Sequence, residues 1–293
     1  IEVTGRKMRY VYTGDRGLRF KSVIEAFRSN LSSFKTQIPN GQYLISLHDG
    51  IHGTVSWPIL AFSSTKQLVN AKKVVLIPDV DALNGYAKLF NRIRISSKQH
   101  PWDTKIDKIF WRGTATGAGP VTKSLDSFYR AKFLYYSEHL SFVDAAFSSR
   151  TGYLAEDLQK QLDEKFPLAP RVLQEDSLAY KYLMDIDGNS CSYSRMAWIL
   201  YSNSLLMKHQ TDNIQWYYGK LKPAVHYLPI AKDFSNLQAQ YEWAQSHQAE
   251  VITITQNAHQ LAQQIFSRRA INQAVVDGLV KYQQIIASMK RPA

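Results

Sequence analysis

Short apolar runs alternate with longer amphipathic stretches along this 293-residue chain, and this alternation is the feature that most limits its fold. Runs such as "KKVVLIPD" are rich in β-branched residues and end at turn-prone residues, which is typical of buried strands. The expected strands lie in 43–47, 57–63, 72–79, 108–111, 140–148, 179–187, 204–208 and 224–230. Strands that alternate with helices predict βαβ units with parallel sheets, and therefore an α/β fold.

Helical periodicity fills most of the intervening sequence. The expected helices are 81–94, 124–139, part of 152–165, 195–201, 236–247, 250–266 and 271–289. Ser235 and Gln238 have the spacing of a capping box for the helix at 236–247. The order of elements predicts two sheets that divide near residues 98–105. We therefore expect domains at 1–104 and 105–266, with a helical segment 267–293 that packs back on the first domain.

The composition indicates a globular protein with an affinity for polyanions. The net charge is +12 at pH 7, which favours nucleic acid, an anionic membrane surface or phosphate-bearing substrates, and composition does not rank these three. A single cysteine, Cys191, provides neither an internal disulfide nor a zinc cluster. No apolar run has the length of a transmembrane helix and no signal-peptide pattern opens the chain, so we expect a cytoplasmic protein, with peripheral contact at the inner membrane as an option.

Polar loops follow three of the expected strands, and ligands of α/β proteins bind at such strand ends. The loop 188–194 is rich in serine, and Ser194 stands where it could cap a helix that begins at Arg195. A helix N-terminus attracts anions, and an arginine beside it would add a bidentate phosphate contact. A capped helix with a solvent-facing arginine explains the same residues, so both interpretations stay open.

Two further strand ends carry candidate residues. Arg112, Gly113 and Thr114 follow Trp111, and this succession allows close backbone approach and a phosphate contact, although an ordinary polar loop fits as well. Asp49 follows another strand, between His48 and Gly50, where a carboxylate could act as a general base. From the local sequence alone, a turn aspartate is the more common interpretation.

The pair Asp185 and Asp187 suggests a divalent metal site, because two carboxylates at a strand end suit a hard cation that bridges a diphosphate. The two side chains share a face only if the strand continues through both. Arg112 and Arg195 at neighbouring strand ends could neutralise a diphosphate without a metal. We therefore favour a metal-free site and assign the aspartates to the strand end, with Asp187 ordering the loop that follows.

Four segments in a fixed order resemble glycosyltransferase family 90. They are "SLHDG", "FWRGTATG", "YKYLMDIDGNSCSYSRMAWILYSNSLLMK" and "WYYGKLKPAVHYLPIAKDFSNL". This family includes fungal capsule-associated proteins, animal protein O-glucosyltransferases and bacterial lipopolysaccharide core enzymes of the LpsA type. The resemblance runs from Tyr43 to the C-terminal helices.

The resemblance implies a GT-B fold with two Rossmann-like domains facing across a cleft, a UDP-sugar donor held by the C-terminal domain, and inversion at the anomeric carbon. It also implies that no metal or other cofactor is needed. By position, Asp49 matches the catalytic base. The donor-binding positions implied by the match are Arg112, Gly113, Thr114, Asp187, Ser190, Ser192, Ser194 and Arg195. The spacing before Arg195 is one residue longer than in some relatives, so the serine positions follow less directly than the arginine does.

The chain ends in Lys290–Ala293 without the retention tail of animal members, and it has one cysteine, so it is similar to the bacterial branch. We expect a hexose or pentose to be moved to a saccharide acceptor such as a phosphorylated lipopolysaccharide core glycolipid. Two other functions remain open at this point. A kinase of such sugars is suggested by Asp187-Gly188-Asn189, although no Gly-rich loop with lysine accompanies it. A nucleic-acid-binding protein is suggested by charge alone, and no motif for nucleic acid supports it.

Overall fold

The computed structural model describes residues 1–4, 7–9, 18–31, 37–117, 125, 128–151 and 156–289. Contacts divide these residues into two compact units. Unit 1 contains 1–86, 212–219 and 264–293, and unit 2 contains 87–211 and 220–263. The first division falls after Tyr86 and not within 98–105, because helix α4 (Ala87–Gln99) packs on α7 (Tyr193–Tyr201) of unit 2. The C-terminal segment belongs to unit 1, where α10 (Arg268–Met289) contacts two strands.

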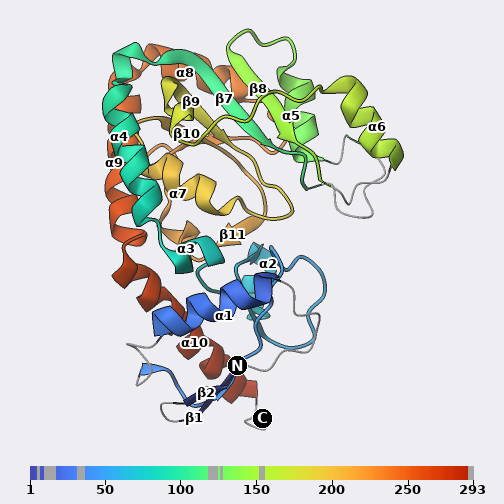
Figure 1. Cartoon of the computed structure of the whole chain (residues 1–293), viewed down its shortest axis with the longest axis vertical. Helices are drawn as coiled ribbons and strands as arrows, with labels where there is room; N and C mark the ends of the chain where they lie inside the picture. Colours follow the sequence, from blue (N-terminus) through green and yellow to red (C-terminus); the bar gives the residue numbers. More distant parts are fainter. Residues whose placement is uncertain are drawn as a thin grey trace. The chain divides into compact units, whose positions relative to one another are not determined.

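Unit 2 is built on a five-stranded parallel sheet in the order β12-β10-β9-β7-β8 (Figure 1). Its strands are β7 (Ile106–Thr114), β8 (Val143–Ser149), β9 (Tyr180–Asp185), β10 (Leu205–His209) and β12 (Leu228–Ile230). Its remaining helices are α5 (Tyr129–Ser137), α6 (Glu156–Lys165), α8 (Leu237–Ser246) and α9 (Gln248–Ile265), the last of which ends in unit 1. The predicted α/β class with a parallel sheet is confirmed.

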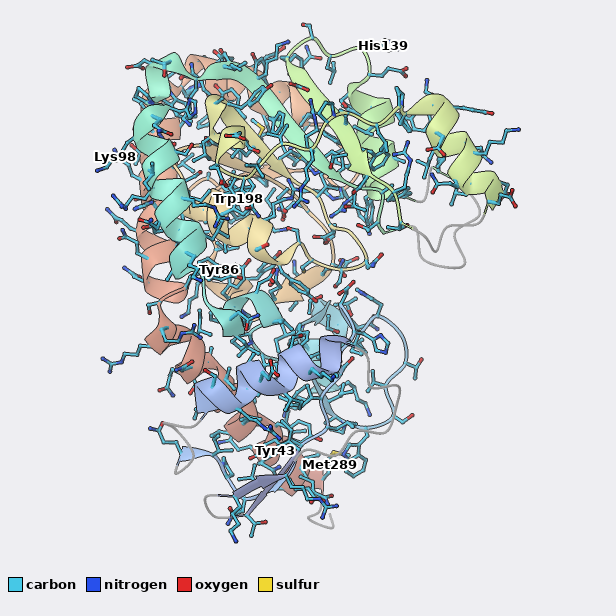
Figure 2. The ribbon with its side chains drawn as sticks, in the orientation of Figure 1. Tyr43, Tyr86, Lys98, His139, Trp198 and Met289 are labelled. Carbon is cyan, nitrogen blue, oxygen red and sulfur yellow. The ribbon has the colours of Figure 1, made fainter. Side chains whose placement is uncertain are left out.

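The core of unit 2 follows from strand alternation in β7. Ile109 and Trp111 point to one face, where Trp111 is fully buried with its ring 5.8 Å from that of Phe147. Phe110 and Arg112 point to the opposite face. That face is covered by α7, on which Trp198 is labelled in Figure 2. Both faces of this sheet are therefore packed, as βαβ crossovers require.

Unit 1 contains shorter strands and a parallel pair, β4 (Ile59–Ala61) with β6 (Val74–Leu76). Its other strands are β1 (Glu2–Thr4), β2 (Lys7–Arg9), β3 (Gly41–Gln42), β5 (Ser63–Thr65) and β11 (Asn213–Gln215). Its helices are α1 (Leu18–Leu31), α2 (Lys66–Asn70), α3 (Val80–Asn84) and α10. The prediction of a strand at 43–47 is wrong. Only Ile45 forms a parallel bridge, to Leu60, because the chain turns away after Ser46.

Several predicted boundaries also differ from the structure. The helix predicted at 81–94 is two helices, because Gly85 takes a φ of 85° and its N–H returns to the carbonyls that end α3. The predicted capping box is wrong, since the hydroxyl of Ser235 bonds Asp233 and Asn236 precedes α8. The starts predicted at 124 and 152, and the end of the segment 267–293, lie partly outside the described residues. Within the described ranges, no helix combines the length and apolar character needed to span a bilayer.

Candidate active site

The loops that follow β7 and β9 leave the unit 2 sheet at its switch point. The chain passes from β7 to β8 on one side and then returns to place β9 on the other side of β7. Helix α5 consequently covers one face and α7 the opposite face. In open parallel sheets, the carboxyl ends of two such strands enclose the ligand-binding crevice.

Two glycines let these loops touch. The N–H of Gly117 donates to Oδ1 of Asn189 over 3.0 Å, and Gly117 has a φ of 101°. A Cβ at Gly117 would lie 2.8 Å from the carbonyl oxygen of Gly188. A Cβ at Gly188 would lie 2.6 Å from the hydroxyl of Thr116. Glycine is therefore required on both sides of this contact, for space and, at Gly117, for conformation as well.

Arg130, near the start of α5, fastens the same two loops together. Its guanidinium donates to the carbonyl of Thr114 over 2.8 Å and to those of Ile186 and Asp187 over 3.2 Å each. It also donates to the hydroxyl of Thr116. Arg130 is buried, and sequence reasoning missed it because nothing local distinguishes it from an ordinary helix arginine.

A cavity of about 420 Å³ opens at these strand ends. Its wall contains four guanidinium groups, and among the described residues that line it there is no aspartate or glutamate. These groups belong to Arg112, Arg130, Arg171 and Arg195. The floor is apolar and includes Trp198 of α7. Concentrated positive charge beside apolar surface suits an anionic ligand with several acceptor oxygens.

Arg195 is the predicted residue that the structure holds most directly in this cavity. It is half-buried on the first turn of α7, and its Nη2 donates to the carbonyl of Arg112 over 2.6 Å. Burial lowers the pKa of Arg195, while the Asp185 carboxylate acts in the opposite direction. An arginine stays protonated under such shifts. A positively charged guanidinium with limited access to solvent therefore faces the cavity. That situation favours an incoming anion.

Arg112 lines the cavity but is already engaged. Its Nη2 lies 2.5 Å from Oδ1 of Asp144, and its Nη1 donates to the Asp144 carbonyl over 3.1 Å. The hydroxyl of Tyr180 donates to the other Asp144 oxygen over 2.6 Å. Asp144 offsets much of the charge of Arg112, which is therefore a weaker anion partner than Arg195. The loop predicted after Trp111 is also wrong, because β7 continues through Thr114.

The predicted serines separate into two groups. Ser194 lines the cavity with Gly113 and Thr114, whereas Ser190 and Ser192 are not among the lining residues. Ser190 is buried. Helix α7 starts earlier than predicted, at Tyr193 with Ser192 at its N-cap, so Ser194 lies inside the first turn. Ser192 forms no capping hydrogen bond because its hydroxyl donates to Asp185.

The two aspartates of the suggested metal pair are buried and occupied by protein groups. Oδ2 of Asp185 lies 3.8 Å from Nζ of Lys208, and burial raises the pKa of Asp185 against the opposing effect of that ammonium. Oδ2 of Asp187 accepts a hydrogen bond from Thr211 over 2.5 Å. Neither residue lines the cavity. The structure thus uses both as anchors of the strand end, and the predicted donor contact of Asp187 stays a prediction.

Asp49 belongs to unit 1, where it follows a segment that runs parallel to β4. Ser46 N–H donates to the carbonyl of Leu60, and Ile51 N–H donates to that of Ser63 over 3.1 Å. The hydroxyl of Ser64 returns a bond to the Ile51 carbonyl over 2.7 Å. These contacts fix both sides of the half-buried Asp49, which lies in a bend between the isolated bridges of Ile45 and Ile51 and not at the end of a regular strand as predicted. Its role as a base stays a prediction.

A second cavity, of about 430 Å³, opens in unit 1 directly after Asp49. Its described lining consists of Leu44, the segment 50–57 and Ile59. None of the side chains that line it is a lysine, arginine, aspartate or glutamate. Sequence reasoning did not single out this surface.

Comparison with known protein families gives a match that contains the unit 2 cavity. The family description "Glycosyl transferase family 90" matches residues 71–290, which is well over half of the chain. The chain belongs to glycosyltransferase family 90. The predicted family is therefore confirmed, and the match includes the unit 2 cavity, although Asp49 precedes it.

Curated relatives and a solved structure are similar to this chain at low identity. Protein O-glucosyltransferase 2 of Danio rerio is 24% identical over 269 residues, covering 86% of this chain and 49% of the relative. Protein O-glucosyltransferase 1 of Homo sapiens is 28% identical over 143 residues, covering 49% of this chain and 33% of the relative. The chain thus spans about half or less of these relatives. Anabaena HepE, solved with UDP and glucose, aligns with a TM-score of 0.49 and 12% identity over 89% of this chain and 76% of its own.

Proposed function

We propose that this family 90 chain transfers a hexose or pentose from a UDP-sugar to a hydroxyl group of a saccharide acceptor, with inversion at the anomeric carbon. The observation that carries the proposal is the unit 2 cavity, in which four guanidinium groups gather without a lining carboxylate. A nucleoside diphosphate has the size and the charge for such a site. Membership of family 90 supports a sugar as the group that is transferred.

In the proposed reaction, the bond between the anomeric carbon and the diphosphate oxygen breaks as the acceptor oxygen forms its bond from the opposite side. Negative charge therefore grows on the departing UDP. Arg195 and the N-terminus of α7 would stabilise this charge, and preorganised charge of this kind supplies much of the rate enhancement of many enzymes. Arg112 contributes less because Asp144 already binds it. Arg130 acts mainly by holding the two loops in place.

The acceptor hydroxyl must lose a proton as it attacks, and we assign that proton to Asp49. The assignment rests on the position of Asp49, which backbone hydrogen bonds of Ser46 and Ile51 fix on both sides, and on its match to the family pattern. A carboxylate within reach of an acceptor hydroxyl can act as a general base. The products are then UDP and the glycosylated acceptor, with the proton on the carboxylate until solvent removes it.

We further propose that no metal or other cofactor takes part. The support is the occupation of the two candidate ligands, since Asp185 faces Lys208 and Ser192, and Asp187 binds Thr211. Guanidinium groups take the part that a divalent cation would otherwise play. The lipopolysaccharide-type acceptor, the cytoplasmic location and any contact with an anionic membrane stay predictions.

A nucleotide panel tests the proposal. We expect UDP to raise the unfolding temperature of the chain more than ADP, GDP or double-stranded DNA does, and we expect the same result with EDTA present. A response to ADP with magnesium would instead indicate a sugar kinase. Binding of DNA that weakens steeply with salt, without any response to UDP, would indicate a nucleic-acid-binding protein. A response to UDP only with manganese would overturn the metal-free site.

A further inference from the structure

Trp57 is an unusual feature of unit 1, because its large aromatic side chain is about half exposed to solvent in the lining of a cavity. It is 48% exposed, as is Leu44 in the same lining. Gly50 and Ile51, directly after Asp49, line that cavity too. A large apolar side chain that stays exposed in a cavity whose lining begins at the residue after Asp49 points to a binding surface.

The cavity wall that contains Leu44 and Trp57 is anchored from α10 by Tyr282, through Leu44. Tyr282 is buried, its ring lies 5.6 Å from that of Tyr43, and its hydroxyl accepts a hydrogen bond from the Leu44 N–H over 3.3 Å. Burial raises the pKa of Tyr282, while the Leu44 amide and the indole N–H of Trp57 lower it as hydrogen-bond donors. Figure 2 labels Tyr43 in this part of unit 1. Tyr282 thus supports the cavity wall at Leu44, and the half-exposed ring of Trp57 in the same lining is left for a ligand.

The rest of the lining combines aliphatic side chains with three side chains that can form hydrogen bonds, and it contains no lysine, arginine, aspartate or glutamate. His52, Thr54 and Ser56 are exposed members of the lining. A Cβ built on Gly53 would meet nothing within 4 Å, so the cavity is open there. An apolar ring face bordered by hydroxyl and imidazole groups matches a pyranose, which has an apolar C–H face and a rim of hydroxyl groups. A phosphate group would find no lysine or arginine in this lining.

We propose that the cavity after Asp49 is the acceptor subsite and that it binds a neutral sugar ring stacked on the indole of Trp57. This inference rests on the proposed function and adds the substrate class of the acceptor end. It changes the expectation of a phosphorylated acceptor: any phosphate of the acceptor lies away from the ring that this subsite holds. Leu44 extends the same apolar wall, and Asp49 is the next group along the chain from Gly50.

Ligand-observed NMR with saturation transfer tests the proposal on the whole chain in the presence of saturating UDP. The probes are methyl β-D-glucopyranoside, maltose, glucose 6-phosphate and a short serine-containing peptide. We expect transfer to the C–H protons of the neutral sugars, with affinity falling roughly tenfold in Trp57→Ala and within about threefold of wild type in Trp57→Phe. Glucose 6-phosphate should bind no more tightly than the glucoside.

The controls separate this inference from the proposed function. UDP should raise the unfolding temperature equally in wild type, Trp57→Ala and Trp57→Phe, which also shows that the variants are folded. If UDP binds but no neutral sugar does, or if sugar binding is the same in Trp57→Ala, the sugar subsite is wrong. Binding of the peptide alone, lost in Trp57→Ala, would assign the surface to a protein acceptor. A wild-type chain that fails to bind UDP while sugars still depend on Trp57 would overturn the proposed transfer and leave the sugar subsite standing.

Discussion

The two cavities have nearly the same volume, about 420 Å³ in unit 2 and about 430 Å³ in unit 1, but opposite chemistry. The lining of the unit 2 cavity includes four arginines, whereas the unit 1 cavity is lined by an exposed tryptophan, aliphatic residues and neutral polar residues, without a lysine, arginine or carboxylate. In the proposed reaction the donor carries the charge and the acceptor ring is neutral. The difference supports the proposal that each unit binds one of the two substrates.

The two cavities are also held open in different ways. In unit 2, protein carbonyls and Asp144 orient the guanidinium groups, so the cavity depends on polar contacts between loops. In unit 1, the buried Tyr282 supports the wall through Leu44. Changes in charge should therefore affect donor binding, and changes in shape should affect acceptor binding.

Among the variants that separate donor binding from events at the acceptor, Asp49→Asn is expected to have the largest effect, on the rate of transfer. Loss of a general base lowers the rate of transfer by roughly 10²- to 10⁴-fold, whereas the binding of UDP should not change because Asp49 is not among the residues of the arginine-lined cavity. Steady-state transfer rates and UDP titration would measure the two quantities. The neighbouring His48→Ala serves as a matched control, with at most a small loss of rate. Wild-type rates in Asp49→Asn would show that another group removes the proton.

The two units also differ in the charges that surround their buried carboxylates, and Asp79→Asn tests this difference. Asp185 of unit 2 faces Lys208, but the charged neighbour of Asp79 in unit 1 is another carboxylate, Asp81. Burial, followed by the charge of Asp81, raises the pKa of Asp79 from 3.8 to about 7. The folded state therefore holds this proton more tightly than the unfolded state does, so the stability it adds is present below pH 3.8 and is lost as the pH rises through 7.

Asparagine keeps the cap at this position, since its amide oxygen can accept the bonds that Asp79 takes from the N–H groups of Asp81 and Ala82. We expect Asp79→Asn to be more stable than wild type at pH 8 by roughly 2 to 4 kcal/mol, with the difference closing toward pH 4. Urea unfolding at both pH values would measure it. The exposed Asp81→Asn should give a much smaller gain. An equal gain at both pH values would show that ionisation of Asp79 is not the cause.

A smaller effect is expected for Arg195→Ala in the arginine-lined cavity. Removing one charged hydrogen-bond donor from a diphosphate site weakens UDP binding by roughly 10- to 100-fold, because such bonds contribute about 1.5 to 3 kcal/mol. Arg195→Lys should recover part of the loss, since it keeps the charge but not the planar fork. Calorimetric titration with UDP and with uridine would show the origin of the loss. A similar loss for uridine, which has no phosphate, would place Arg195 at the nucleoside instead.

Regular patterns in the sequence predicted much of unit 2 and less of unit 1. The central strands β9 and β10 of unit 2 are buried on both faces over most of their length, so they stand out from the amphipathic helices between them. The segment Tyr43–Leu47 has the same local pattern, yet only Ile45 pairs, because strand pairing depends on distant partners such as Leu60. The predicted helix at 81–94 is divided at Gly85, and the turn-prone pair Asn84-Gly85 is the local signal for this division.

Residues of the candidate site were predictable from the sequence where they directly follow or end a strand. Arg195 and Ser194 follow β9 and line the cavity with Gly113 and Thr114 of β7. Arg130 and Arg171 were missed, because they reach the cavity from segments that carry no strand-end signal. The partnership of Arg112 with Asp144 was also hidden, since it depends on which strand lies beside β7. Trp57 needed its exposed fraction to be known before it could be distinguished from a core tryptophan.

The smallest effect is expected for Arg171→Ala, which separates exposed from buried charge within one cavity. Arg171 lines the cavity but is exposed, so water and salt screen its attraction for a diphosphate. We expect UDP affinity to fall by only about two- to fivefold at low salt and to match wild type near 0.5 M salt, whereas the loss in Arg195→Ala should persist there because Arg195 is less accessible to solvent. UDP titrations over a salt series would compare the two variants. If Arg171→Ala lost as much affinity for UDP as Arg195→Ala at every salt concentration, the expectation would be wrong. Such a result would indicate that the segment that carries Arg171 closes over the bound diphosphate and shields the Arg171 charge from solvent.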